Sequence, residues 1–118
     1  MDELSQMHCS PVNASTPRLT DSEIKQLLVQ IPGWRLYEEG REPRLEKAFQ
    51  FKDFNQAVVF TNRVAQLANE EDHHPAILTE WGKVTVTWWT HRIKGLHQND
   101  FIMAAKTDQL FESPRLQT

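Results

Sequence analysis

The sequence predicts a single α+β domain, with one four-stranded antiparallel sheet and three helices packed on one of its faces. Two observations predict this fold class. Segments with apolar residues at helical spacing alternate with segments in which every second residue is apolar, in the order helix, two strands, helix, two strands, helix. The length of 118 residues suits one hydrophobic core, and a second core is not expected.

The first helix is expected to begin directly after Thr20. The side chain of Thr20 can cap this helix, and Glu23, three residues later, can complete a capping box. Leu19 and Ile24 can pack together as a hydrophobic staple. Apolar residues then recur at helical spacing until Pro32-Gly33, a pair typical of a helix end.

Two strands and a second helix are expected next. Residues 34–37 alternate in polarity, and residues 45–51 alternate again after a turn-prone segment at 39–43, which predicts two antiparallel strands. Asp53 is expected to cap the longest helix, which ends near residues 69–71. The expected inner face of this helix consists of Phe54, Ala57, Val58, Phe60, Val64, Ala65, Leu67 and Ala68.

The remaining two strands are expected at residues 76–80 and 83–90, with a turn at Trp81-Gly82 between them. Side chains alternate along a strand, so the core face should carry Val84, Val86 and Trp88. The opposite face should then carry Thr85, Thr87, Trp89 and His91. We therefore expect His91 to end this strand away from the aliphatic core, where it can face a pocket.

The two ends of the chain are expected to lie outside the domain. Residues 1–18 lack apolar periodicity, which predicts a flexible, disordered or loosely docked arm without an assigned function. His8 and Cys9 in this arm are expected to be bystanders and not a metal-binding pair. The domain is expected to span residues 19–113, where Ser113-Pro114 closes the last helix, and residues 114–118 form a tail.

Composition narrows the class of protein. The formal net charge is −3, and the Lys and Arg residues are scattered, so direct nucleic-acid binding is disfavoured. The single cysteine, Cys9, excludes an intramolecular disulfide and is consistent with a reducing cytoplasm. No apolar run approaches the ~20 residues of a membrane helix, and no signal-peptide pattern is present, so we expect a cytoplasmic protein without a membrane segment.

Three of the five histidines, His73, His74 and His91, are the candidate functional residues. Imidazole titrates near pH 6.5, so several rings around one pocket can give and take protons at neutral pH. Pro75 forces His74 out of helical geometry into an extended conformation. Asp72 can hold one ring in a single tautomer while a more buried ring stays neutral, which gives an acid and a base in one site.

Two other interpretations of these histidines stay open. A zinc site with three His ligands is conceivable, although adjacent side chains in an extended chain diverge and rarely reach one ion. The rings could also satisfy buried polar groups in a purely structural role. Glu70 and Glu71 are expected to form a solvated helix end, not a catalytic pair. No nucleophile elbow, phosphate-binding glycine loop or dinucleotide fingerprint is present.

Several short motifs resemble those of a known enzyme family. They are Asp72-His73-His74-Pro75, Lys83-Val84-Thr85-Val86, Thr90-His91, Gly95-Leu96 and Asp100, with Gly33-Trp34 and Phe49-Gln50-Phe51-Lys52-Asp53-Phe54 upstream. Together they resemble pterin-4a-carbinolamine dehydratase over about residues 19–110. The Asp-His-His-Pro element, followed by Thr-His about fifteen residues later, is the most specific part of the resemblance.

The resemblance implies a hydro-lyase that uses neither metal nor bound cofactor. Such an enzyme dehydrates 4a-hydroxytetrahydrobiopterin to quinonoid dihydropterin and so regenerates the cofactor of aromatic amino-acid hydroxylases. His73, His74 and His91 match the three active-site histidines of the family, with the acid and the base not distinguished. The residues that would shape the pterin pocket or lie near it are Asp72, Pro75, Thr90, Arg92, Asp100 and Trp34.

The chain departs from the family pattern at two positions. Several relatives have Glu where this chain has Asn69, so a carboxylate acting at that place is in doubt. Relatives often begin the last helix with Ser or Thr where this chain has His97, so the cap must come from His97, Asn99 or water. We expect His97 to be a helix-start residue and not a fourth catalytic histidine.

The resemblance also carries expectations about partners. Family members are tetramers built from dimers, which predicts a homotetramer here. A mammalian relative also serves as a dimerisation cofactor of a homeodomain transcription factor. The alternative function is therefore a non-catalytic regulatory or dimerisation partner of a hydroxylase or transcription factor.

Overall fold

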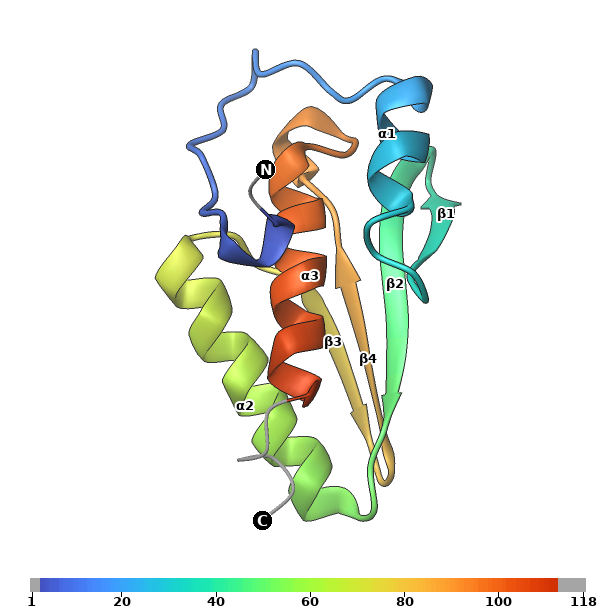
Figure 1. Ribbon diagram of the computed structural model, residues 1–118, viewed down its shortest axis with the longest axis vertical. Coiled ribbons are helices and arrows are strands. Elements are labelled where there is room, and N and C mark those ends of the chain that lie inside the picture. Colours follow the sequence, from blue (N-terminus) through green and yellow to red (C-terminus); the bar gives the residue numbers. More distant parts are fainter. Residues whose placement is uncertain (1–2, 113–118) are drawn as a thin grey trace.

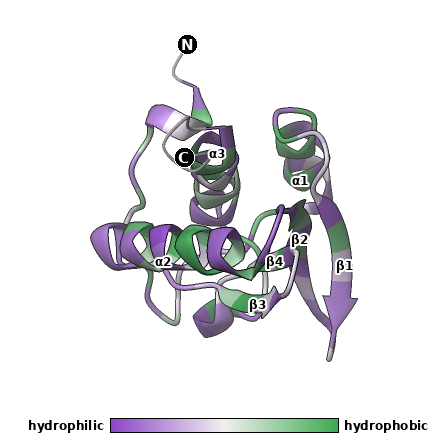
Figure 2. Ribbon diagram, turned by 90° about the horizontal axis from the view of Figure 1, so that it is seen from below, coloured by the Kyte–Doolittle hydropathy of each residue, from purple (hydrophilic) through white to green (hydrophobic). Residues whose placement is uncertain are grey.

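The computed structural model describes residues 3–112 and contains one antiparallel sheet with three α-helices. The helices are α1 (Asp21–Leu28), α2 (Phe54–Glu71) and α3 (Gln98–Glu112), and two short 3-10 helices are η1 (Leu4–Gln6) and η2 (His91–Ile93). The strands are β1 (Arg35–Glu39), β2 (Glu42–Gln50), β3 (Ala76–Glu80) and β4 (Lys83–Trp88), in the spatial order β1-β2-β4-β3. All neighbouring strands are antiparallel, and Figure 2 shows the three helices on one side of the sheet, which confirms the predicted fold class.

The start of α1 follows the predicted capping pattern. The Thr20 hydroxyl accepts from the Glu23 backbone N–H, and the Glu23 carboxylate accepts from the Thr20 backbone N–H, so the capping box is complete. Ile24 is buried. The helix therefore begins where local hydrogen bonding dictates, and its one buried face attaches it to the core.

The core lies between the sheet and the helices (Figure 1). Register pairs Leu45 with Trp88 and Phe49 with Val84, so β2 and β4 present a continuous apolar surface to α2 and α3. Phe49 packs against Phe60 of α2, with ring centroids 4.9 Å apart. Fully buried aromatic rings of this size dominate the apolar area removed from water.

The prediction of the residues on the inner face of α2 is partly wrong. Ala57, Phe60, Val64 and Ala68 are buried, but Phe54 is 49% exposed and Ala65 is also exposed. α2 packs against α3, β3 and β4, and the margins of its apolar face stay in solvent.

The end of β4 also differs from the prediction. The strand ends at Trp88, not at Thr90, and His91 begins the 3-10 turn η2. Thr90 instead forms an isolated bridge with Gly95, in which its N–H donates to the Gly95 carbonyl at 3.0 Å. His91 is therefore carried by a turn beyond the sheet.

The N-terminal segment is docked on α3 (Figure 1). Leu4 of η1 is 5% exposed, and Lys106 of α3 donates from Nζ to the Ser5 carbonyl at 3.1 Å. Gln109 donates from Nε2 to Ser5 Oγ at 3.0 Å. The sequence-based expectation of a flexible arm did not include these contacts, because one apolar residue and a few hydrogen bonds leave no periodic pattern. The expected helix end at Ser113-Pro114 and the tail at 114–118 lie outside the described residues.

In the described part of the chain, no helix combines the length and the apolar character needed to cross a membrane.

We predict that Thr107→Val lowers the free energy of unfolding by about 1–3 kcal/mol, although the two side chains have nearly the same shape. Trp88 is fully buried, and its Nε1–H donates to Thr107 Oγ1 at 3.1 Å, so the substitution leaves a buried donor without an acceptor. Urea denaturation measures the change. Thr85→Val, on the opposite face of β4, is the matched control and should change stability by less than about 0.5 kcal/mol. Equal stability of the T107V protein and the unmodified protein would contradict the assignment.

Candidate active site

The end of α2 sets the positions of two adjacent histidines. Asp72 adopts a left-handed conformation with φ 52° and ψ 45°, which Asp tolerates better than most residues. The His73 N–H donates back to the Ala68 carbonyl at 3.1 Å and closes the helix. Pro75 follows and leads into β3, so the backbone between helix and strand is extended at His74. The two rings consequently leave the chain in different directions and find different partners.

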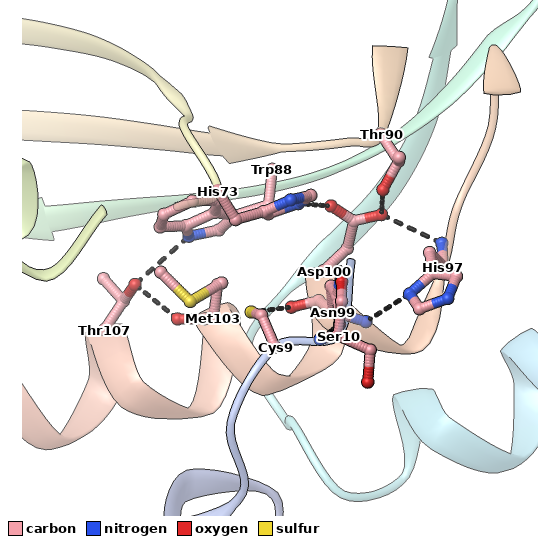
Figure 3. Close-up of polar contacts among 10 residues, drawn as sticks. All are labelled: Cys9, Ser10, His73, Trp88, Thr90, His97, Asn99, Asp100, Met103 and Thr107. Carbon is pink, nitrogen blue, oxygen red and sulfur yellow. Dashed lines mark hydrogen bonds and ion pairs between the residues drawn. The ribbon is translucent and has the colours of Figure 1, made fainter. Parts of the chain in front are cut away.

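A fully buried carboxylate, Asp100, joins three segments of the chain (Figure 3). Its Oδ1 accepts from His73 Nε2 at 2.6 Å, at the end of α2. Its Oδ2 accepts from the Thr90 hydroxyl at 2.7 Å, beyond β4, and from the His97 backbone N–H at 3.0 Å, at the start of α3. Three donors therefore compensate the burial of one charge.

Asp100 also selects the tautomer of His73. An ionised carboxylate can only accept, so an ionised Asp100 requires a proton on Nε2 of the His73 ring. The ring is stacked on Trp88, with centroids 5.9 Å apart and an angle of 13° between the planes. His73 is thus held at its edge by Asp100 and on its face by Trp88, and Nδ1 has no hydrogen-bond partner in the described part of the chain.

His97 is the cap of α3, as expected. Its Nδ1 accepts from the Asn99 backbone N–H at 3.0 Å, while Asp100 accepts from the backbone N–H of His97. This is the reciprocal arrangement of a capping box, with imidazole in the place of a hydroxyl. The ring is occupied in this role and does not line the cavity described next.

A cavity of about 490 Å³ lies where these segments meet. Its walls are formed by Cys9, Ser10, Pro11, Val12, Glu71, Asp72, His73, His74, Trp89, Thr90, His91, Arg92 and Asn99. All three candidate histidines are in this set. The wall consequently combines the end of α2, the chain beyond β4, the start of α3 and the N-terminal segment.

His74 and His91 are held less tightly than His73. His74 is exposed, and its Nε2 lies 3.0 Å from Asn69 Oδ1, so an amide stands here as the hydrogen-bond acceptor. His91 has a side chain that is 77% exposed, and its Nδ1 lies 3.4 Å from Glu42 Oε1. The three rings therefore have three different environments around one cavity.

The structure separates the other predicted site residues. Asp72, Thr90 and Arg92 line the cavity together with the histidines. Pro75 does not line it. Trp34 lies elsewhere, because it is buried against Phe49 and donates from Nε1 to Asp108 Oδ2 at 3.0 Å.

Glu71 differs from the expectation of a solvated helix end. Its side chain is only 10% exposed, and it accepts from the Cys9 N–H and from His8 Nδ1, both at 2.8 Å. Burial alone would raise the pKa of this carboxyl. The hydrogen bonds from Cys9 and His8, with the charges of Lys106 and His8, outweigh burial and lower the pKa below its ordinary value of 4.5. Glu70 is exposed, as expected.

Sequence reasoning missed the contributions of residues 9–12, Glu42, Trp89 and Asn99. None of these positions carries a recognised motif, and each becomes part of the site only through contacts between distant segments. Residues 9–12 lie at the cavity, and the Cys9 N–H donates to Glu71. This position could not be inferred from a segment without apolar periodicity. In the region from 3 to 112, no group of three or more His, Cys, Asp and Glu side chains could hold a metal ion.

Comparisons with known proteins point to the same family. The family model described as pterin 4 alpha carbinolamine dehydratase matches residues 17–110. Two curated relatives carry the provisional name pterin-4-alpha-carbinolamine dehydratase. The protein from Marinobacter nauticus is 56% identical over 94% of this chain and 100% of the relative, and the protein from Nitrosococcus oceani is 54% identical over 95% and 99%.

Two solved structures are similar in fold. A protein from Brucella melitensis, described as a transcriptional coactivator/pterin dehydratase, has a TM-score of 0.72 and 36% identity, over 80% of this chain and 98% of that chain. A pterin dehydratase-like protein, described as a RuBisCO assembly factor in the alpha-carboxysome, has a TM-score of 0.59 and 28% identity, over 69% and 92%. The cavity-lining residues 9–12 lie outside the span that the family model matches.

We predict that Cys9 in the folded protein reacts with iodoacetamide at pH 8 at least about 100-fold more slowly than in the urea-unfolded protein, because only the thiolate is nucleophilic. Burial first, and then the charges of Glu71 and Asp100, raise the pKa of this thiol from 9.0 to about 12. Mass spectrometry measures the rate, and Cys9 is the only cysteine in the chain. Equal rates in the folded and unfolded states would contradict the docked position of Cys9.

Proposed function

Because the chain belongs to the pterin 4 alpha carbinolamine dehydratase family, we propose that it dehydrates a pterin 4a-carbinolamine by histidine acid–base catalysis. The proposed substrate is 4a-hydroxytetrahydrobiopterin, and the products are quinonoid dihydropterin and water. The observation that carries the proposal is the Asp100-held ring of His73 beside a cavity that His74 and His91 also line.

The reaction needs two proton transfers on neighbouring atoms of the substrate. The C4a–O bond breaks as a proton reaches the leaving oxygen. The N5 proton passes to a base, and its electron pair forms the C4a=N5 double bond. Imidazolium suits the first transfer and neutral imidazole suits the second, so the reaction consumes no oxidant or reductant.

The hydrogen-bond partners of the rings select the nitrogens available for this chemistry. Nε2 is occupied in both His73 and His74, so Nδ1 of each ring can exchange a proton with the substrate. The Nδ1 of His91 lies 3.4 Å from Glu42 Oε1 without forming a hydrogen bond, so either nitrogen of this ring is available. The proposal names these nitrogens and leaves open which ring is the acid and which is the base.

The cavity is suitable in size for a bicyclic heterocycle, since ligand sites are commonly about 300–1,000 Å³. Asp72, Thr90 and Arg92 are the proposed substrate-binding residues in its wall. Asp100 acts through His73 and is proposed as a positioning residue. Pro75 would contribute through the backbone conformation of the histidine pair. Trp34 is not retained, because its contacts lie with Phe49 and Asp108.

The proposed physiological role is recycling of tetrahydropterin for an aromatic amino-acid hydroxylase, and the proposed compartment is therefore the cytoplasm. This role would follow from the product, because quinonoid dihydropterin is one reduction away from the cofactor. A homotetramer built from dimers remains our proposed assembly.

A non-catalytic role as a regulatory or dimerisation partner is the second candidate. The observation that favours it is the similarity to a structure described as a RuBisCO assembly factor in the alpha-carboxysome. A protein that acts only through its surface has no need of a buried carboxylate that orients a ring beside a cavity. The His73–Asp100 pair therefore favours the enzyme.

Stopped-flow decay of 4a-hydroxytetrahydropterin, with and without the protein, tests the proposed function. We predict acceleration by the unmodified protein and loss of that acceleration in the double variant His73→Ala/His74→Ala, with unchanged circular dichroism. Trp81→Ala is the control, because it removes an aromatic ring that is 70% exposed and does not line the cavity. Full activity of the double variant would refute the histidine mechanism.

We predict that Asp100→Asn lowers kcat by about 100-fold or more, because the amide no longer fixes the His73 tautomer and general acid–base catalysis is lost. Asp108→Asn is the matched control on the same helix. Its carboxylate binds Lys47 and Trp34 away from the cavity, so kcat should stay within about twofold. The pH dependence of kcat should change shape in the D100N protein alone. Equal kcat values for the two variants would show that Asp100 has only a structural role.

A further inference from the structure

The cavity has one wall that comes from a distant part of the sequence. Residues Cys9, Ser10, Pro11 and Val12, which we call the N-terminal wall, line the same space as the three histidines. They precede the part of the chain that matches the family model. The proposed acid–base chemistry assigns them no task.

The N-terminal wall is anchored at the segments that carry the site. The Ser10 N–H donates to Asn99 Oδ1 at 2.9 Å, and Asn99 Nδ2 donates to the Ser10 carbonyl at 2.8 Å. Asn99 is 2% exposed, so its side chain is committed to this two-point contact (Figure 3). The Cys9 N–H donates to Glu71 at 2.8 Å, and Arg92 donates from Nη1 to the Val12 carbonyl at 3.1 Å.

A second set of contacts holds the same segment at a distance from the cavity. Leu4 is buried on α3, and the backbone and side chain of Ser5 accept from Lys106 and Gln109. Leu4 and Ser5 do not line the cavity. The position of the N-terminal wall can therefore be disturbed without changing any atom in contact with a bound ligand.

We propose that the N-terminal wall is a substrate-retaining surface of the pterin site, so that affinity for the pterin depends on docking of residues 3–12 and the chemical step does not. The inference rests on the proposed function. Pro11 and Val12 add apolar contact to a site whose remaining lining is mostly polar. The proposed proton transfers use the three histidines and no residue of the wall, so we expect the wall to contact the ground state and the transition state equally. Loss of such uniform binding raises KM and leaves kcat unchanged.

The first test releases the wall by Leu4→Asp in the full-length chain. Burying Asp on α3 is unfavourable, so the segment should undock, and faster alkylation of Cys9 reports this directly. We expect KM for the carbinolamine to rise by about five- to tenfold with kcat within about twofold. Val29→Asp, at a position that is 80% exposed near the end of α1, is the matched control and should change neither. Fast alkylation of Cys9 together with an unchanged KM would overturn the inference.

A second variant is needed if Cys9 in the Leu4→Asp protein is still alkylated slowly, because the segment has then not undocked. Val12→Trp places a large side chain at the wall itself and should raise KM whether or not the segment moves. An unchanged KM in this variant overturns the inference.

Binding measured without turnover separates this inference from the proposed function. Quenching of tryptophan fluorescence by 6-methyltetrahydropterin, which has no 4a-hydroxyl to lose, reports affinity alone. Weaker binding to the L4D protein than to the V29D protein supports the wall even if the unmodified protein fails to accelerate dehydration. Equal binding to both variants, with Cys9 exposed in the first, contradicts the wall while leaving dehydration by the unmodified protein intact.

Discussion

A single buried carboxylate is the constraint on which the site depends. Asp100 is inaccessible to solvent and accepts hydrogen bonds from His73, Thr90 and His97. An ionised group in the interior is tolerated only when donors replace its lost hydration, and removing one partner typically costs about 3–5 kcal/mol. The end of α2, the turn after β4 and the start of α3 must therefore converge on this point. The cavity lies beside this junction. The hydrogen bonds that allow Asp100 to be buried therefore also position the site.

The same junction gives three chemically identical side chains three different settings. The side chain of His73 is 11% exposed, stacked on Trp88 and bound to a carboxylate, whereas His74 is exposed and bound to an amide. His91 lies on a 3-10 turn at a longer distance from Glu42. A site that needs both a proton donor and a proton acceptor requires such differences, because equivalent rings would share one protonation state. The proposed chemistry therefore depends on the groups around the rings as much as on the rings themselves.

The order of helices and strands could be predicted because apolar periodicity and capping pairs such as Thr20 with Glu23 act locally. The histidine cluster could be predicted from its motif, and the role of His97 from its place before α3. The burial of Glu71 could not, since it depends on a backbone N–H donated from 62 residues earlier in the chain. The resemblance places Trp34 near the site, but its indole N–H donates to Asp108. Contacts that join distant segments leave no trace in local patterns.

The most direct test of this account is the tautomer of His73, measured by long-range ¹H–¹⁵N correlation NMR at a pH where the ring is neutral. The account predicts a protonated Nε2 and an unprotonated Nδ1, because the Asp100 carboxylate can only accept a proton from the ring nitrogen it contacts. In the D100N protein this preference should be lost. A His73 ring that carries its proton on Nδ1 in the unmodified protein would contradict the account.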